Sequence, residues 1–382
     1  MIRRTQTAEL DVNELRETIR EVLDREAGSD RTRHAMSQPV GHDTKLWEMI
    51  SELGWTGIAI PEEYGGAGTS LVELGVVVQE LGRCLAPCAF VPSVVFFGGA
   101  LLVAGTSAQR ANLLPRIASG DLLASVALVG PAGRCEPDGI GIEIEDRGSE
   151  LSLRGNASYV PDADVAELIL VAGRTREGDL ALVVVETGLD SVEITPQPLF
   201  DPTRRFSRLN LHDVVVPREA MLDSTDTGAR LHGSLVDLGA IATACDSVGG
   251  AGQVLESTLK YMKQRHQFGR PVASFQALKH RCADMMMRVE GSVVSVARAL
   301  EAFAGEQADA RVAISEAKFF TADSYTHVAQ EGVQMHGGVG FTWEYDCHLH
   351  LKRAMLNQAL LGDSRWHRDR AANALLGEPA QT

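Results

Sequence analysis

The spacing of apolar positions divides the chain into three stretches. From about residue 8 to 120, apolar residues recur every three or four positions, as they do in amphipathic helices. Between 121 and 220, short β-branched or alternating runs are separated by Gly, Asp and Pro, which predicts strands. Helical spacing then returns after Pro217. We therefore expect a multidomain α+β protein with an N-terminal helical domain (1–120), a middle β-barrel domain (121–220) and a C-terminal four-helix bundle (221–382).

The sharpest break in the helical pattern lies in QRHQFGRPVASFQALKHRCADMMMR, residues 264–288. Before it, apolar residues step by three or four from Leu238 to Met262, and after it an apolar ladder begins at Phe275. Gly269 and Pro271 interrupt the pattern and predict a tight turn. The chain thus places an Arg between two long helices, with two residues separating it from a Phe-Gly pair.

Composition and charge argue against several classes of protein, among them nucleic-acid-binding, membrane-spanning and secreted proteins. The 382 residues suggest two or three domains, and the formal charge of -15 argues against a nucleic-acid or anionic-membrane partner. No apolar run approaches the length of a membrane span, and the N-terminus lacks the hydrophobic stretch of a secretory signal. The six cysteines lack the spacing of a metal site, so we expect small core residues, no metal and a cytoplasmic location.

Three segments in this order resemble the acyl-CoA dehydrogenase family: ELGWTGIAIPEEYGGAG (52–68), YMKQRHQFGRPVASFQALKHRCADM (261–285) and EGVQMHGGVGFTWEYDCHLHLKR (331–353). The resemblance covers nearly the whole chain. It implies an acyl-CoA dehydrogenase-like fold, in which two helical domains enclose a β domain. It also implies a dimer or dimer of dimers, and FAD that removes two hydrogens from the α and β carbons of a CoA thioester.

The resemblance also assigns a role to the turn. In the family, the Arg and Phe of Arg-x-x-Phe-Gly reach across a subunit interface, and the guanidinium, whose planar donors match paired oxygens, clamps the FAD pyrophosphate. A Gln-x-x-Gly-Gly segment faces the adenylate half. For either motif alone, a helix break with an incidental Arg or a Gly-rich turn is an equal alternative. The implied cofactor-binding residues are Arg265, Gln267, Phe268, Gly269, Val272, Phe275, Gln334, His336, Gly337 and Gly338.

The other half of the family's FAD site is missing from the β domain. The family's Thr-Glu-Pro, Gly-Ser-Asp sequence corresponds to ASVALVGPAGRCEPDG (124–139), where only Pro131 and Gly133 match the pattern. The Trp-Ile-Ser or Trp-Ile-Thr piece that backs the flavin ring is replaced by ASYVPDADVAELIL (157–170). We expect that this β domain does not hold a flavin by itself.

The catalytic base is missing as well. Oxidation of a thioester needs a positioned carboxylate to take the α-proton. The family places a Glu at one of two positions, and counting from Arg353 and from Gly269 puts Gly362 and Gly239 there. Asp363 lies one residue from the first position and is the fallback base, although a helix cap is its favoured role. Asp237 lies two residues from the second position, on the wrong helix face.

These features together resemble the non-catalytic partner in α2β2 acyl-CoA dehydrogenases of bacterial steroid side-chain breakdown. The catalytic partner then supplies the base, the flavin-holding β domain and the thioester pocket, FAD is shared, and an electron-transfer flavoprotein is the acceptor. Two alternatives stay open: an active homomer that uses Asp363 or another base, and a flavin-free scaffold. For His336, Trp343, Trp366 and His367 we expect core packing or loop hydrogen bonds.

Overall fold

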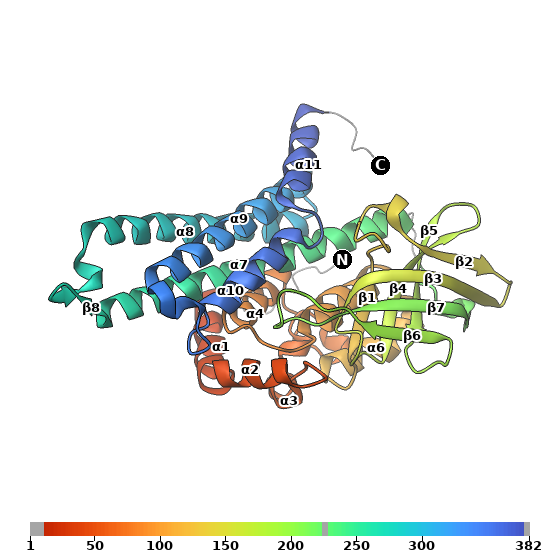
Figure 1. Ribbon diagram of the computed structural model, residues 1–382. Helices are drawn as coiled ribbons and strands as arrows, with labels where there is room; N and C mark the ends of the chain where they lie inside the picture. The colour runs from red at the N-terminus through yellow and green to blue at the C-terminus, as the bar shows by residue number, and fades with distance from the viewer. Residues whose placement is uncertain (1–10, 224–227, 378–382) are drawn as a thin grey trace.

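The computed structural model describes residues 11–223 and 228–377. A β sheet lies at one end of the molecule, long C-terminal helices extend away from it, and the N-terminal helices pack beneath them (Figure 1). The expected order of helical, β and helical regions is confirmed, because the seven strands of the sheet fall between two sets of helices along the chain. None of the helices within the described ranges is long and apolar enough to cross a membrane.

Among the N-terminal helices, α4 (Leu71–Arg83) is buried between α1 and long helices of the C-terminal region. The sequence predicts one apolar face for this segment, yet nearly all of its residues are buried. The polar face is covered because α1 supplies partners: Arg16 donates to Gln79 at 2.6 Å and Arg20 to Glu80 at 2.8 Å. The remaining helices are α1 (Val12–Glu26), α2 (Ser29–Ser37), α3 (Thr44–Glu52), α5 (Gly99–Ala104) and α6 (Ser107–Ala118), with a π-helical segment at Val91–Gly98.

Seven strands form one mixed sheet in the order β1-β4-β2-β3-β7-β6, with β5 paired to β4. In β4, Leu168, Leu170 and Ala172 contact the helical core, and the alternate residues Ile169 and Val171 join a second apolar cluster within the β region. This strand is therefore buried on both faces, as its continuous apolar run predicts. The strands are β1 (Ala124–Ala127), β2 (Ile142–Asp146), β3 (Glu150–Pro161), β4 (Leu168–Thr175), β5 (Leu180–Glu186), β6 (Val192–Pro196) and β7 (Phe206–Pro217).

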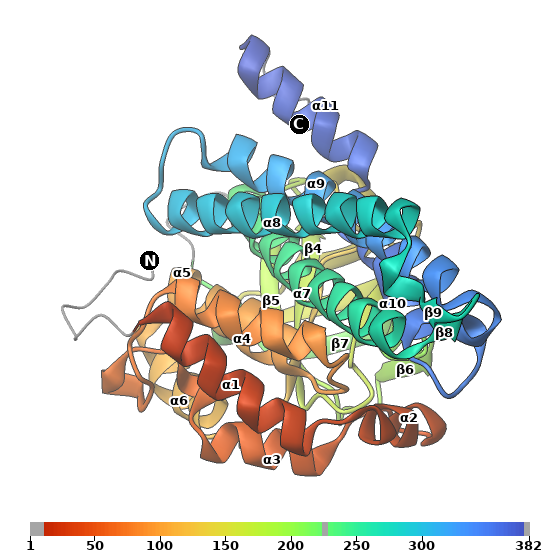
Figure 2. The ribbon, with the colours of Figure 1, turned by 90° about the vertical axis from the view of Figure 1, so that its left-hand side faces the viewer.

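The C-terminal helices form a bundle around α7 (Gly228–Gln264) and α9 (Ala310–His336). As the apolar pattern predicts, Val312, Ala313 and Ala317 of α9 are buried in it. The bundle is completed by α8 (Gln276–Ala304) and α10 (Cys347–Ala359), while α11 (Ser364–Leu376) projects away from the body (Figures 1 and 2).

A buried ionic network ties this bundle to the β region. Arg353 of α10 is fully buried and donates to Asp201 at 2.8 Å and to Asp246 of α7 at 2.9 Å. Arg204 and Asn357 also donate to Asp246, at 2.8 and 2.7 Å. Burial alone would raise the pKa of Asp246, but the charges of Arg353 and Arg204 outweigh it and hold that pKa below its ordinary value. Two arginines and two carboxylates thus neutralise one another where three segments meet.

Replacing Arg353 with Met is expected to lower the free energy of unfolding by about 3–5 kcal/mol, because two buried carboxylates lose their main partner. Denaturant unfolding of the full chain measures this. Arg368→Met removes the ion pair to Asp323 from a side chain that is 56% exposed, and should cost less than about 1 kcal/mol. Equal losses in the two variants would show that the buried network does not hold the regions together.

Candidate functional site

The turn between α7 and α8 is a short β hairpin. Strands β8 (His266–Gln267) and β9 (Arg270–Pro271) pair in antiparallel fashion, and backbone bonds of 2.8 Å from Arg265 N to Tyr261 O and from Val272 N to Arg265 O anchor them. The hairpin extends beyond the ends of both helices (Figures 1 and 2).

The tip of the hairpin is exposed and strained. Phe268 is 91% exposed and has a φ of 53°, a left-handed conformation that costs an aromatic residue on the order of 1–2 kcal/mol. The Arg265 guanidinium is also exposed, and within the described chain it makes no ion pair. The hairpin therefore carries an exposed ring, which meets only the Phe275 ring edge-on with centroids 6.0 Å apart within the described chain, and a cation without an ion pair.

A second turn lies at the same end of the bundle. There α9 ends at His336 and a 3-10 segment, Gly337–Phe341, follows. The ring of Tyr261, just before the hairpin, stacks on His336 with centroids 4.4 Å apart, and its hydroxyl donates to the His336 carbonyl at 3.3 Å. The structure thus brings the Arg265 turn and the Gln334 segment together.

The backbone at both turns is open to a ligand. Apart from the adjacent residues in the chain, no described residue has an atom within 4 Å of where a Cβ would stand at Gly269, Gly337 or Gly338. Gly269 and Gly337 have φ values of 77° and 67°, which favour glycine. Bare backbone beside the Arg265 guanidinium suits a phosphate-bearing ligand, so these residues fit the diphosphate half of FAD.

The remaining residues that the sequence predicts to bind FAD lie in or next to these two turns. His336 is buried, its Nδ1 donates to the Gly332 carbonyl at 2.7 Å, and burial lowers its pKa, so it holds the turn as a neutral ring. The Gln267 amide is exposed and donates to the His266 carbonyl. Val272 and Phe275 are half-buried at the base of the hairpin, where Arg270 covers the Phe275 ring.

An apolar cavity lies at the other end of the bundle, between the sheet and α7. Segment 124–139 contributes only residues with apolar side chains to it, and segment 157–170 contributes Tyr159 and Pro161. At its polar end, Arg204 and Asn357 both donate to Asp246. A flavin needs hydrogen-bond partners along its pyrimidine edge, so these side chains do not fit one. The lining is Val91, Pro92, Phe96, Val126, Leu128, Val129, Tyr159, Pro161, Arg204, Phe206, Ala242, Thr243, Asp246, Asn357, Leu360 and Leu361.

Both expected base positions are filled by neighbouring side chains. A Cβ on Gly239 would lie 2.3 Å from the Phe96 ring and 2.5 Å from Leu361, and a Cβ on Gly362 would lie 2.4 Å from the Trp366 ring. It is Leu361, and not Gly362, that lines the cavity. Next to Gly362, the apolar side chain of Leu361 therefore faces the cavity.

The nearby carboxylates do not replace the base. Asp363 is the N-cap of α11, its Oδ1 accepts from Trp366 N at 2.8 Å, and it is absent from the cavity lining. Asp363 thus has the helix-cap role that the sequence favours. Asp237 is buried in an ion pair with Arg370 of α11. Asp246 faces the cavity, but its lowered pKa and three donors make it a poor base.

Sequence reasoning missed Lys318, which is fully buried on α9 and donates to the Gly362 carbonyl at 2.9 Å. Burial lowers its pKa to about 8. His367 is buried as expected, and its Nε2 donates to the Leu361 carbonyl at 3.0 Å. The carbonyls of Leu361 and Gly362 are therefore both hydrogen-bonded to buried side chains.

Trp343 was expected to pack in the core or to form a loop hydrogen bond. It is instead 64% exposed and lies beside Arg33.

The family is settled by comparison with known proteins. The model for the acyl-CoA dehydrogenase N-terminal domain matches residues 10–121, and that for the C-terminal domain matches 226–376. The chain belongs to the acyl-CoA dehydrogenase family, a family of acyl-CoA oxidoreductases. Acyl-CoA dehydrogenase IpdE2 of Mycobacterium tuberculosis is 33% identical over 353 residues, 92% of this chain and 93% of that protein.

Two solved assemblies contain similar chains. A chain of the ChsE4-ChsE5 complex from Mycobacterium tuberculosis is 25% identical with a TM-score of 0.89, covering 99% of this chain and 100% of that one. A chain of the Tcur3481-Tcur3483 steroid acyl-CoA dehydrogenase is 26% identical with a TM-score of 0.86, covering 96% and 98%. Both structures are named as pairs of different subunits.

Gly362→Glu should lower the melting temperature without creating activity, because the new Cβ meets Trp366 and the φ of 96° is left-handed. The loss should be on the order of 1–3 kcal/mol. Gly233→Glu is the matched control, since that helical glycine has no atom within 4 Å of a Cβ and should be neutral or stabilised. Turnover by Gly362→Glu alone would mean that the cavity accepts a base and a flavin after all.

Proposed function

We propose that this chain is the non-catalytic subunit of a heteromeric, α2β2 acyl-CoA dehydrogenase and completes the FAD site of its catalytic partner. FAD, when bound, accepts a hydride from the β-carbon of an acyl-CoA thioester. The observation that carries the proposal is the contrast between the two ends of the molecule. The Arg265 hairpin is open and unpartnered, whereas the cavity beside the sheet lacks a base and has apolar walls.

The position of the hairpin supports donation to another subunit. It lies at the far end of the bundle from the chain's own β sheet (Figure 1). Arg265 therefore does not face the cavity of its own chain, and a ligand that it clamps is held mainly by a neighbour. In this arrangement the exposed Phe268 ring is covered by the partner, which offsets the cost of its strained backbone.

The residues that this chain contributes to the partner's FAD site contact different parts of the cofactor. The Arg265 fork binds the diphosphate oxygens, and the Gln334 amide with the backbone of Gly337 and Gly338 meets the adenylate half. His336 and Tyr261 keep the two turns in register. The partner supplies the base that takes the α-proton, the flavin-holding β domain and the thioester pocket.

The similar assemblies support a heteromer and a substrate class. The name of one describes a steroid acyl-CoA dehydrogenase, and both contain two kinds of subunit. We extend this to a bulky acyl-CoA, such as a steroid side-chain thioester, bound mainly on the partner, with an electron-transfer flavoprotein as acceptor. An active homomer is disfavoured because Asp363 caps a helix and Asp246 is held by arginines.

The chain purified alone is expected to be colourless and to turn over no acyl-CoA with added FAD. Co-expression with a neighbouring acyl-CoA dehydrogenase gene should yield a yellow complex that contains both chains. Absorbance near the flavin bands and turnover of homogeneous samples test both points. A yellow, active single chain would support the homomer, and a colourless complex would support the flavin-free scaffold.

Arg265→Ala should weaken FAD retention by the complex about ten- to a hundredfold, because a charge-assisted contact of roughly 1.5–3 kcal/mol is lost. Arg265→Lys should recover only part of it, since a point charge does not reproduce the fork. Gln334→Ala should have a milder effect. FAD content per folded complex and the melting temperature are measured on the same preparations.

The matched control is Arg154→Ala, which removes an exposed arginine from β3 and should leave FAD retention unchanged. If Arg265→Ala lowers the melting temperature while flavin occupancy stays constant, Arg265 only terminates α7 and the cofactor role is wrong.

A further inference from the structure

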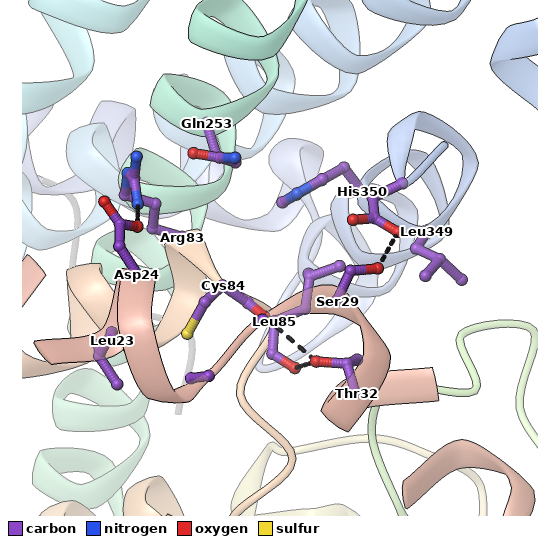
Figure 3. Close-up of a pocket in the computed structure, with 13 residues that line it drawn as sticks. Leu23, Asp24, Ser29, Thr32, Arg83, Cys84, Leu85, Gln253, Leu349 and His350 are labelled. Carbon is purple, nitrogen blue, oxygen red and sulfur yellow. Dashed lines mark hydrogen bonds and ion pairs between the residues drawn. The ribbon is translucent and has the colours of Figure 1, made fainter. Parts of the chain in front are cut away.

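A polar cavity lies where the N-terminal helices meet the C-terminal bundle, apart from both features above. It has a volume of about 110 Å³ and is enclosed by the α1–α2 junction, the end of α4, α7 and α10 (Figure 3). By a similar measure a single water needs roughly 10–15 Å³, so there is room for a small organic molecule. Leu23, Leu85 and Leu349 give it apolar walls between the polar groups.

His350 points into this cavity from α10 with a fixed proton (Figure 3). It is only 4% exposed, and its Nδ1 lies 2.7 Å from the hydroxyl of the fully buried Tyr325. Among the described residues that hydroxyl has no other hydrogen-bond partner, so it donates to Nδ1 and the ring proton is on Nε2. Burial lowers the pKa of His350 to about 4, so the ring is neutral at physiological pH. Nε2–H is left as a donor for which the described chain offers no acceptor.

Gln253 reaches across the cavity from α7 with a second unpaired group (Figure 3). Its Oε1 is buried and has no hydrogen-bond donor among the described residues. Rotation of the terminal amide exchanges its donor and acceptor, so one end faces the cavity in either orientation. A buried unpaired polar group such as the Gln253 oxygen costs about 1–3 kcal/mol. Since His350 lines the same space, a molecule held between the two side chains would supply the missing partner.

The charged groups around the cavity already neutralise one another. Arg83 donates to Asp24 at 2.5 Å and to Glu256 at 2.9 Å. Asp346 accepts from Ser29 at 2.6 Å and from Arg33. A bound anion would meet the two lining carboxylates, Asp24 and Asp346, and a bound cation would meet Arg83 and the His350 N–H. The environment therefore favours a neutral ligand.

We propose that this cavity binds a small neutral molecule that carries both a hydrogen-bond acceptor and a donor, such as a primary carboxamide. Its carbonyl accepts from His350 Nε2–H, and its other polar end pairs with the Gln253 amide. Because the lining comes from both helical regions, the ligand bridges α1 and α2 to α7 and α10. The site involves none of the residues proposed to contact FAD.

Acetamide, acetate and acetamidinium test the ligand class, because they share one shape and carry charges of 0, -1 and +1. Titration of the full chain, or of its complex with the catalytic subunit, should give an affinity for acetamide at least about tenfold above that for either ion. A crystal soaked in acetamide should show it between His350 and Gln253. Ordered water alone in the cavity, or tighter binding of either ion, would overturn the proposal.

Gln253→Met separates binding from a structural role, since Met keeps the length of the side chain and removes the amide. Acetamide affinity should fall about tenfold, while the melting temperature of the ligand-free chain stays constant or rises because an unpaired buried carbonyl is gone. Gln307→Met, at an exposed loop glutamine, should change neither quantity. Unchanged acetamide affinity, or a lower melting temperature in Gln253→Met, would contradict the ligand role.

Discussion

The buried pairing of Arg353 with Asp201 and Asp246 is the interaction on which the rest of this structure depends. It joins α10, α7 and the loop before β7, so it sets where the sheet meets the helical bundle. An ionic contact at this depth is stable only while every charge keeps its partners. The network therefore fixes the polar end of the apolar cavity in one arrangement.

The same network makes Asp246 unsuitable as a catalytic base. Asp246 is the carboxylate that faces the apolar cavity, and it is already bound by two arginines and an asparagine. A general base needs a pKa near the working pH and an accessible oxygen, and the arginines remove both. Leu361 and Phe96 line the cavity with apolar groups and Trp366 packs against Gly362, so this end of the molecule favours packing over catalysis.

The end of the molecule that carries the Arg265 hairpin is open instead of packed. At the hairpin and the Gly337 turn the backbone is bare, the cation is unpaired and an aromatic ring is exposed, although the helices beneath are well packed. Strain and exposure of this kind persist where a partner covers them. One chain thus combines an apolar cavity that lacks a base with an open contact surface, as the proposed role of completing a neighbour's site requires.

The sequence by itself determined the succession of helical, β and helical regions and the two glycine-rich turns. These depend on near-neighbour patterns: apolar period, turn residues and positive-φ glycines. Even the role of Asp363 as a helix cap was favoured from local chemistry. The tertiary structure alone decided that Leu361 faces the cavity, that α4 is buried on every side and that Lys318 is buried. The partners of Arg353 lie 152 and 107 residues away in the chain, and no local pattern encodes a contact over that separation. Burial and charge pairing depend on which segments meet in space, so they became visible only in the folded chain.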